Sequence, residues 1–235
     1  MQGKKQNFNI SLSEYPREVC LVLYHSPCFL HCNWCFNKNN LKNTLLNFKT
    51  SVEIIKENED FITSVCLSGG EPFLSSDFYD ISNYVKEIGL KLKINTSGIV
   101  TPQPDLFTAD YINISLKGNY SDYKRYGYKY SEETLKNNIT LLSDHKYVDK
   151  VEWSVVYHPL IVDLSKVKDL MCSLDCKCDY FTLNQLQIGD CYDDFINDFT
   201  PPNRAELLKQ LNSFKNIPLE HCLIESKEFG REIII

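Results

Sequence analysis

Residues 26–36 read Ser-Pro-Cys-Phe-Leu-His-Cys-Asn-Trp-Cys-Phe, directly after an apolar stretch at 19–25. The three cysteines of this segment, Cys28, Cys32 and Cys35, stand at i, i+4 and i+7. From one short loop, this spacing lets three thiolates converge on one face of a cuboidal iron–sulfur cluster, where they hold three irons and leave the fourth without a protein ligand. An open iron is reactive, so the segment predicts a reactive metal site.

The same cysteines are compatible with a second kind of site. A structural zinc ion takes four ligands, and three thiolates with His25 or His31 would complete its tetrahedron. The spacing also arises by chance at a low rate in a chain with ten cysteines. The cysteines alone therefore leave a cluster, a zinc ion and coincidence open.

A second loop, Ser68-Gly69-Gly70-Glu71-Pro72, follows the next apolar stretch. Taken alone, two glycines after a strand indicate a tight turn, because glycine accepts positive φ and lets the backbone approach a neighbour closely. In parallel α/β proteins, loops at the carboxyl ends of adjacent strands converge over a rigid scaffold. We therefore expect the glycine loop and the cysteine loop to lie together.

Short apolar, β-branched stretches alternate along the chain with amphipathic ones, which predicts strands alternating with helices. The predicted strands are 19–25, 62–67, 90–96, 111–116, 151–157 and 180–188, and the predicted helices are 48–60, 77–88, 132–143, 164–174 and 204–214. Ser131 and Thr134 form a near-match to a capping box at the start of the third helix. Many strands run four or more apolar residues in a row, which favours a parallel sheet buried on both faces. A curled barrel and an open doubly wound sheet both fit this α/β pattern.

Composition bounds the function. The chain has 235 residues, with 25 basic and 31 acidic side chains and a formal net charge of −6, so it lacks the electrostatic footprint of a nucleic-acid-binding protein. No apolar run approaches the roughly 20 residues of a membrane helix, and the N-terminus is polar. We expect a cytoplasmic protein with no membrane partner. In that reducing compartment, ten cysteines favour thiolate chemistry or metal binding over disulfides.

A CxxxCxxC loop followed by a Gly-Gly-Glu-Pro loop after the next strand resembles the signature of the radical S-adenosylmethionine (SAM) superfamily, and the resemblance extends over nearly the whole chain. It implies a single domain, 1–235, with a partial (β/α)6 TIM-type barrel of parallel strands at about 19–190 and a C-terminal cap at about 191–235. It also implies that Cys28, Cys32 and Cys35 hold a 4Fe-4S cluster whose open iron chelates SAM. A low-potential donor such as flavodoxin or ferredoxin would supply the electron that cleaves SAM, and the resulting 5′-deoxyadenosyl radical would abstract hydrogen from substrate.

The resemblance also implies contacts to SAM. The glycine loop would meet the methionine amino group, Trp34 would pack near adenine, Lys117 would pair with the carboxylate and Ser115 with the ribose. The full set of expected cofactor-binding residues is Trp34, Gly69, Gly70, Glu71, Pro72, Thr96, Ser97, Ser115, Lys117, Asn184 and Gln185. The ordinary alternatives are a core tryptophan for Trp34 and a solvated loop lysine for Lys117.

Two weaker features, residues 11–16 and residues 156–161, are similar to segments of the activating enzymes of anaerobic ribonucleotide reductase and pyruvate formate-lyase. The chain departs from that group at Pro16-Arg17, where Pro-Gly is common, and at 36–38, where His-Asn-Pro is common. The similarity implies a protein substrate, a glycine of a partner glycyl radical enzyme. The alternatives are a ribosomally made peptide, a small molecule as in carboxy-deazaguanine synthases, or a zinc-stabilised α/β binding protein without enzymatic activity.

Three further expectations concern the rest of the chain. Cys172, Cys176 and Cys178 are either plain thiols or ligands of a second metal. The tyrosine-rich run 120–130 is either a substrate lid or a solvated loop. A sheet of six strands does not close, so a lateral gap should remain beside the first and sixth strands, flanked by 190–202 and 120–130.

Overall fold

The computed structural model describes residues 7–35, 37, 46–189, 191–214, 217 and 219–234. Its nine strands form one sheet, ordered as they follow in the sequence. The seven inner strands are parallel, and the two outer ones, β1 and β9, are antiparallel to their neighbours. The strands are β1 (Phe8–Ser11), β2 (Cys20–His25), β3 (Ser64–Gly69), β4 (Lys91–Thr96), β5 (Ala109–Leu116), β6 (Val148–Tyr157), β7 (Tyr180–Gln185), β8 (His221–Ser226) and β9 (Gly230–Ile233). This mostly parallel, open sheet confirms the predicted fold class.

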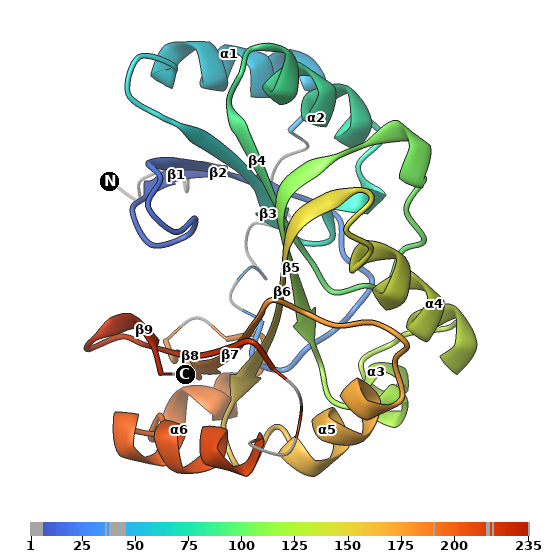
Figure 1. Ribbon diagram of the computed structural model, residues 1–235. Coiled ribbons are helices and arrows are strands. Elements are labelled where there is room, and N and C mark those ends of the chain that lie inside the picture. Colours follow the sequence, from blue (N-terminus) through green and yellow to red (C-terminus); the bar gives the residue numbers. More distant parts are fainter. Residues whose placement is uncertain are drawn as a thin grey trace.

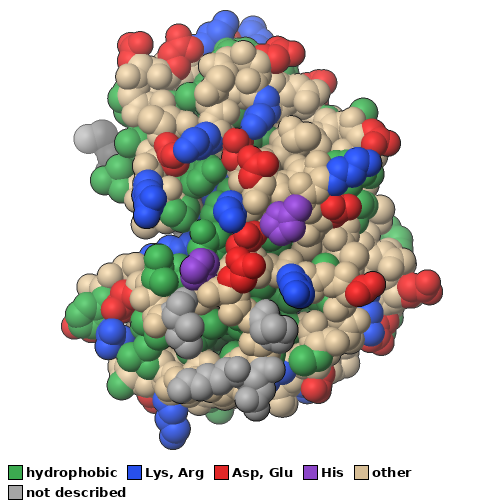
Figure 2. Space-filling view, in the orientation of Figure 1, with side chains coloured by type: hydrophobic (Ala, Val, Ile, Leu, Met, Phe, Trp, Pro, Cys, Tyr) green, Lys and Arg blue, Asp and Glu red, His purple; other side chains and the backbone are tan. Residues whose placement is uncertain are grey.

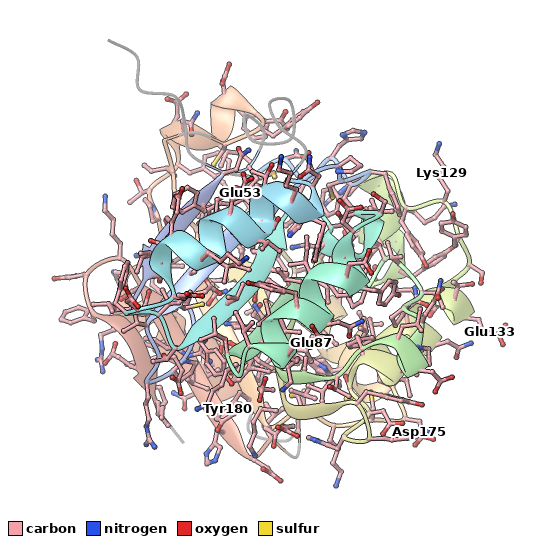
Figure 3. The ribbon with its side chains drawn as sticks, turned by 90° about the horizontal axis from the view of Figure 1, so that it is seen from above. Glu53, Glu87, Lys129, Glu133, Asp175 and Tyr180 are labelled. Atoms are coloured by element: carbon pink, nitrogen blue, oxygen red, sulfur yellow. The ribbon has the colours of Figure 1, made fainter. Side chains whose placement is uncertain are left out.

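Helices cover the outer side of the curved sheet, while the side between β1 and β9 stays open (Figure 1). The α-helices are α1 (Phe48–Asn58), α2 (Phe78–Glu87), α3 (Tyr120–Arg125), α4 (Glu132–Leu142), α5 (Leu164–Cys172) and α6 (Arg204–Leu211). Short 3-10 helices are η2 (Pro72–Leu74), η3 (Pro104–Leu106), η4 (Asp194–Asp198) and η5 (Asn212–Phe214). Seen from above, α1 and α2 run side by side and carry Glu53 and Glu87 (Figure 3). Within the described residues, no helix is long and apolar enough to cross a membrane.

The strands alternate between two apolar environments, as a period of two residues requires. On β2, Leu21 and Leu23 belong to the large core between sheet and helices. Cys20 and Val22 belong to a separate small cluster, together with Tyr111, inside the barrel. The outer core therefore carries the packing, and the inner face is available for other residue types.

The strand register brings the predicted loops to one edge. His25 at the end of β2 pairs with Gly69 at the end of β3, and Thr96 at the end of β4 pairs with Ile114 of β5. The cysteine loop and the glycine loop therefore leave the sheet at the same level, as expected from parallel strands.

The C-terminal region differs from the expectation of a cap. β8 adds a seventh parallel strand, and β9 folds back on it, so that this region continues the sheet. The open side therefore lies between β1 and β9 rather than beside the two strands that the prediction placed at the edges. Residues 36, 38 and 190, which belong to segments named in the sequence analysis, lie outside the described residues.

Candidate active site

The three cysteines line one cavity at the carboxyl ends of the strands, of about 940 Å³ including its mouth. The other expected site residues that line it are Trp34, Gly69, Gly70, Thr96, Ser97, Ser115, Lys117 and Asn184. Glu71 and Pro72 do not line it, and Gln185 faces a second cavity instead. The structure thus brings together expected residues from five parallel strands or the loops after them.

Backbone hydrogen bonds hold the cysteine loop. Cys35 N–H donates to the Cys32 carbonyl at 3.0 Å, and His31 N–H donates to the Tyr126 carbonyl at 2.8 Å. On the other side, Asp193 N–H donates to the Asn33 carbonyl at 2.9 Å. The loop is therefore anchored to two segments distant in sequence, the end of α3 and the start of η4.

The tyrosine-rich run is neither a lid nor a solvated loop, which corrects the expectation for 120–130. Tyr123, Tyr126 and Tyr128 are buried. The Tyr123 hydroxyl donates to the Ser97 carbonyl at 3.1 Å, and the Tyr126 ring packs edge-on against Trp34 at 5.1 Å between centroids. Although Tyr130 at the end of the run is exposed, the three buried tyrosines support the site from behind rather than covering it.

Gly69 sits where the two loops touch. It has φ +108°, and a Cβ there would lie 2.5 Å from both the backbone nitrogen and the carbonyl oxygen of His25. Next to it, Gly70 N–H donates to the His25 carbonyl at 2.7 Å, and Glu71 N–H donates to the Pro27 carbonyl at 3.0 Å. Glycine is required because only a residue without Cβ allows this approach of two backbones.

Glu71 is fully buried and binds the loop after β4. Its carboxylate accepts hydrogen bonds from the Thr96 hydroxyl at 2.7 Å, from Ser97 N–H at 2.9 Å and from the Ser97 hydroxyl at 2.7 Å. Burial raises the pKa of Glu71, and these donors counteract that rise. Its position makes Glu71 a link between two cavity loops rather than a lining residue.

Burial also raises the pKa of two thiols in the cysteine loop. It raises the pKa of Cys28 to about 12 and the pKa of Cys32 to about 11, and the charge of Lys117 lowers the latter. Thiols with these pKa values are protonated at neutral pH, so binding of a metal must release their protons. Lys117 therefore favours the anionic form of the nearest thiol.

The positions of the cysteines and histidines bear on the alternative of a structural zinc ion. Within the described part of the chain, no three His, Cys, Asp or Glu side chains are grouped so as to hold one metal ion. A cubane cluster needs wider spacing than a single ion, because each thiolate binds a different iron. His25 and His31 also stay out of the cavity lining, and burial lowers the pKa of His25 to about 4. Neither histidine thus joins the three cysteines in the cavity lining.

The cavity also suits a polar organic cofactor. Several buried lining atoms have no hydrogen-bond partner among the described residues: Asn95 Oδ1, Asn113 Oδ1, Ser154 Oγ and Asn184 Oδ1. Buried polar atoms are normally paired, so these atoms indicate a ligand or water in the cavity. The Lys117 ammonium, 2.8 Å from the Ser115 hydroxyl, offers positive charge to a carboxylate. The residues present therefore fit SAM, with its carboxylate, amine and hydroxyl groups.

Charged residues inside the barrel were missed by the sequence analysis. Lys93 pairs with Glu14 at 3.1 Å, and Arg231 pairs with Glu152 at 3.0 Å. A sequence signal was present, since Lys93 and Glu152 lie within the predicted strands 90–96 and 151–157. In the structure both are almost fully buried. Their pairs line a second cavity behind the first.

Cys172, Cys176 and Cys178 lie at the opposite end of the sheet. Cys172 is exposed, Cys176 is half-buried and Cys178 is buried. Among the described residues they belong to no group that could hold a metal ion. They do not share the cavity that Cys28, Cys32 and Cys35 line.

Comparison with known proteins places these observations in a family. The family model described as the radical SAM superfamily matches residues 25–162, more than half of the chain. A Methanocaldococcus jannaschii protein named as a glycyl-radical enzyme activating enzyme is 28% identical over 213 residues, which covers 85% of this chain and 86% of that protein.

Two solved structures share the fold. SuiB of Streptococcus suis bound to S-adenosylmethionine superposes with a TM-score of 0.64 at 18% identity, covering 87% of this chain and 50% of that chain. QueE from Escherichia coli has a TM-score of 0.52 at 16% identity, covering 76% of this chain and 80% of that one. The chain thus spans about half the length of SuiB.

Proposed function

The chain belongs to the radical SAM superfamily, and from this membership we propose that it is an activating enzyme that removes a hydrogen atom from a glycine of a partner glycyl radical enzyme. Membership implies an enzyme with a 4Fe-4S cluster and SAM as cofactors. We assign the cluster to Cys28, Cys32 and Cys35, because they are the three thiols that line the cavity.

With both cofactors bound, the cluster would supply one electron to cleave the bond between sulfur and C5′ of SAM, which would give methionine and a 5′-deoxyadenosyl radical able to take a hydrogen atom from substrate. A low-potential donor such as flavodoxin or ferredoxin would supply the electron. The contribution of the chain is to bind and orient, since cofactor enzymes leave the chemistry to the cofactor.

In this proposal, each group of lining residues has a separate task. Lys117 binds the methionine carboxylate, and Ser115 contacts the ribose. Trp34, held by Tyr126, forms an apolar wall suited to adenine. Glu71 positions the Thr96–Ser97 turn, and so acts through its neighbours rather than by contact.

One observation carries the activating role. The named activating enzyme matches this chain over nearly the full length of both proteins. The open side of the barrel supports it, because a protein loop needs an entrance. Figure 2 shows the surface hollowed on that side, between the edge of β1 and the edge of β9. Since three tyrosines of the 120–130 run are buried, we assign the entrance to this open side and not to that run.

We expect deuterium transfer from a glycine to the cofactor product. The reduced protein and SAM are incubated with peptides copied from the glycine loops of glycyl radical enzymes, deuterated at the glycine Cα. Mass spectrometry should find deuterium in 5′-deoxyadenosine, because the hydrogen atom moves directly to C5′. A peptide with undeuterated glycine is the matched control.

Label that comes only from a small metabolite, or from a side chain of a precursor peptide, would reject the activating role. The favoured function would then be modification of a small molecule or of a ribosomally made peptide. SuiB, which has also been solved with its precursor peptide SuiA, shares the fold.

A further inference from the structure

A second cavity lies inside the barrel, adjoining the first. We call it the inner chamber, and its charged lining residues are Glu14, Lys93, Glu152, Glu225 and Arg231. Trp34, Asn95, Asn113 and Asn184 line both cavities. A molecule in the inner chamber would therefore lie next to a cofactor bound in the first cavity.

Most charges of the inner chamber are already paired. Lys93 and Glu14 form one ion pair, and the Asn95 amide donates to the same Glu14 carboxylate at 2.8 Å. Arg231 and Glu152 form the other, and the Tyr111 hydroxyl donates to Glu152 at 2.9 Å. These two pairs are neutral in sum.

Glu225 is the charged lining residue of the inner chamber that belongs to neither ion pair. It stands between two lining residues across the sheet, paired in register with Asn184 of β7 and with Arg231 of β9. Among the described residues its carboxylate makes no hydrogen bond or close ion pair. Burial raises the pKa of Glu225, whereas the charge of Arg231 lowers it. Glu225 is half-buried, so a ligand in the chamber can reach its carboxylate. A carboxylate binds a cationic hydrogen-bond donor more strongly than a neutral one.

Acceptor atoms line the same chamber as this carboxylate. Asn95 Oδ1 is buried without a partner, and its identity as an acceptor is fixed because the same amide donates its nitrogen to Glu14. Asn113 and Asn184 add two more buried amide oxygens without partners in the described structure. Of the unpartnered lining atoms, these three are acceptors and Arg231 Nε is a donor, so a bound group needs mainly hydrogen-bond donors. The carboxylate of Glu225 adds a preference for positive charge.

We propose that Glu225 binds a cationic, donor-rich group of the substrate, a guanidinium or an ammonium, and so seats the substrate in the inner chamber beside the cofactor cavity. The proposal rests on the proposed function, because it names what the substrate presents to this enzyme. The group can belong to an arginine or lysine of a polypeptide, or to a free amine. Glu225 is carried by the C-terminal hairpin of β8 and β9, which gives that hairpin a role in specificity.

The test measures whether a positive charge on the ligand strengthens its binding to the wild-type protein. One series of peptides has a central glycine and a single arginine, placed at a different flanking position in each peptide. A second series has uncharged citrulline in place of the arginine. The binding of each peptide to the anaerobic holoprotein with SAM is titrated. At the matching position, arginine should bind about tenfold more tightly than citrulline, the gain of a charge-assisted hydrogen bond. Equal binding of arginine and citrulline at every position, and of agmatine and an uncharged analogue, would overturn the proposal.

Two variants locate the effect. Glu225→Gln should reduce the preference for the cation to less than about twofold, whereas Glu228→Gln, an exposed residue of the same hairpin, should keep it. A preference that persists in Glu225→Gln would assign the cation to another residue and contradict the proposal. Its unfolding midpoint, compared with that of the wild type, shows whether Glu225→Gln is folded.

Further comparisons identify the molecule that supplies the cationic group. They also separate the cation subsite from the proposed activating role. Free agmatine that binds in a Glu225-dependent way, while no arginine peptide does, identifies a small amine as the source. Glu225-dependent preference without deuterium transfer from any glycine rejects the activating role but keeps the subsite. Deuterium transfer from a glycine without a preference for a cation supports the activating role and rejects the subsite.

Discussion

Replacement of Cys28, Cys32 and Cys35 together by alanine is expected to remove the iron and sulfide of the protein almost completely. These thiols are the cysteine side chains that line the cavity, and each of them would bind a separate iron of the cluster. Anaerobically purified wild-type protein should be brown and contain about four irons per chain. Iron and sulfide analysis and the broad charge-transfer absorption measure the difference.

The matched control is the triple alanine variant of Cys172, Cys176 and Cys178, which lies at the far end of the sheet. It should keep the full cluster, because these thiols do not line the cavity that holds Cys28, Cys32 and Cys35. Retention of iron in the first variant, or its loss in the control, would show that residues in another part of the chain bind the cluster.

The second large effect is expected for Gly69→Ala. The new methyl group would stand 2.5 Å from two backbone atoms of His25, and the residue would have to keep φ +108°. Neither backbone can move without separating the glycine loop from the cysteine loop. Backbone strain and overpacking each cost about 1 to 3 kcal/mol, so we expect a loss of about 3 kcal/mol or more. Denaturant unfolding of the cluster-free protein measures this free energy.

Gly89→Ala provides the control, since Gly89 has φ +79° but a Cβ there would meet no atom within 4 Å. Its cost should be about 1 kcal/mol, from the backbone conformation alone. If Gly69→Ala were no more destabilising than Gly89→Ala, the close approach of the two loops would not be important for stability.

Much of the central sheet follows from local pattern. The strand that precedes the cysteines begins at Cys20 and ends at His25, within one residue of its predicted bounds. The helix after Ser131 also begins as expected, because the Ser131 hydroxyl accepts from Thr134 N–H at 3.1 Å. Long apolar runs and caps are determined by neighbouring residues, which a sequence displays directly.

The edges of the sheet could not be predicted in this way. β1 and β9 have four residues each and are half-exposed. The alternation in β1 covers only Phe8 and Ile10, and β9 has one apolar residue, Ile233, so neither segment carries a strong strand signal. β8 has a run of only three apolar residues, 222–224, and it precedes Glu225, Ser226 and Lys227, which obscures its end. Its place in the sheet depends on pairing with β7, a long-range contact.

The candidate site shows the same division. The loops that bear the cysteines and Gly69 are recognisable because their spacing and type carry the chemistry. The burial of Tyr123 and Tyr126 behind the site depends on the short helix α3, whose capping box joins Asn119 and Asp122 over only six helical residues. The inner chamber depends on charges from β4, β6 and β9 that meet only in the folded barrel.

The most direct test of the account is the cleavage of SAM by the reduced protein. The anaerobic holoprotein is mixed with dithionite and SAM, and the products are separated by chromatography. The account predicts 5′-deoxyadenosine and methionine in equal amounts, formed slowly without substrate and only with the reductant. Intact SAM after prolonged reduction of a protein that holds its full cluster would contradict it.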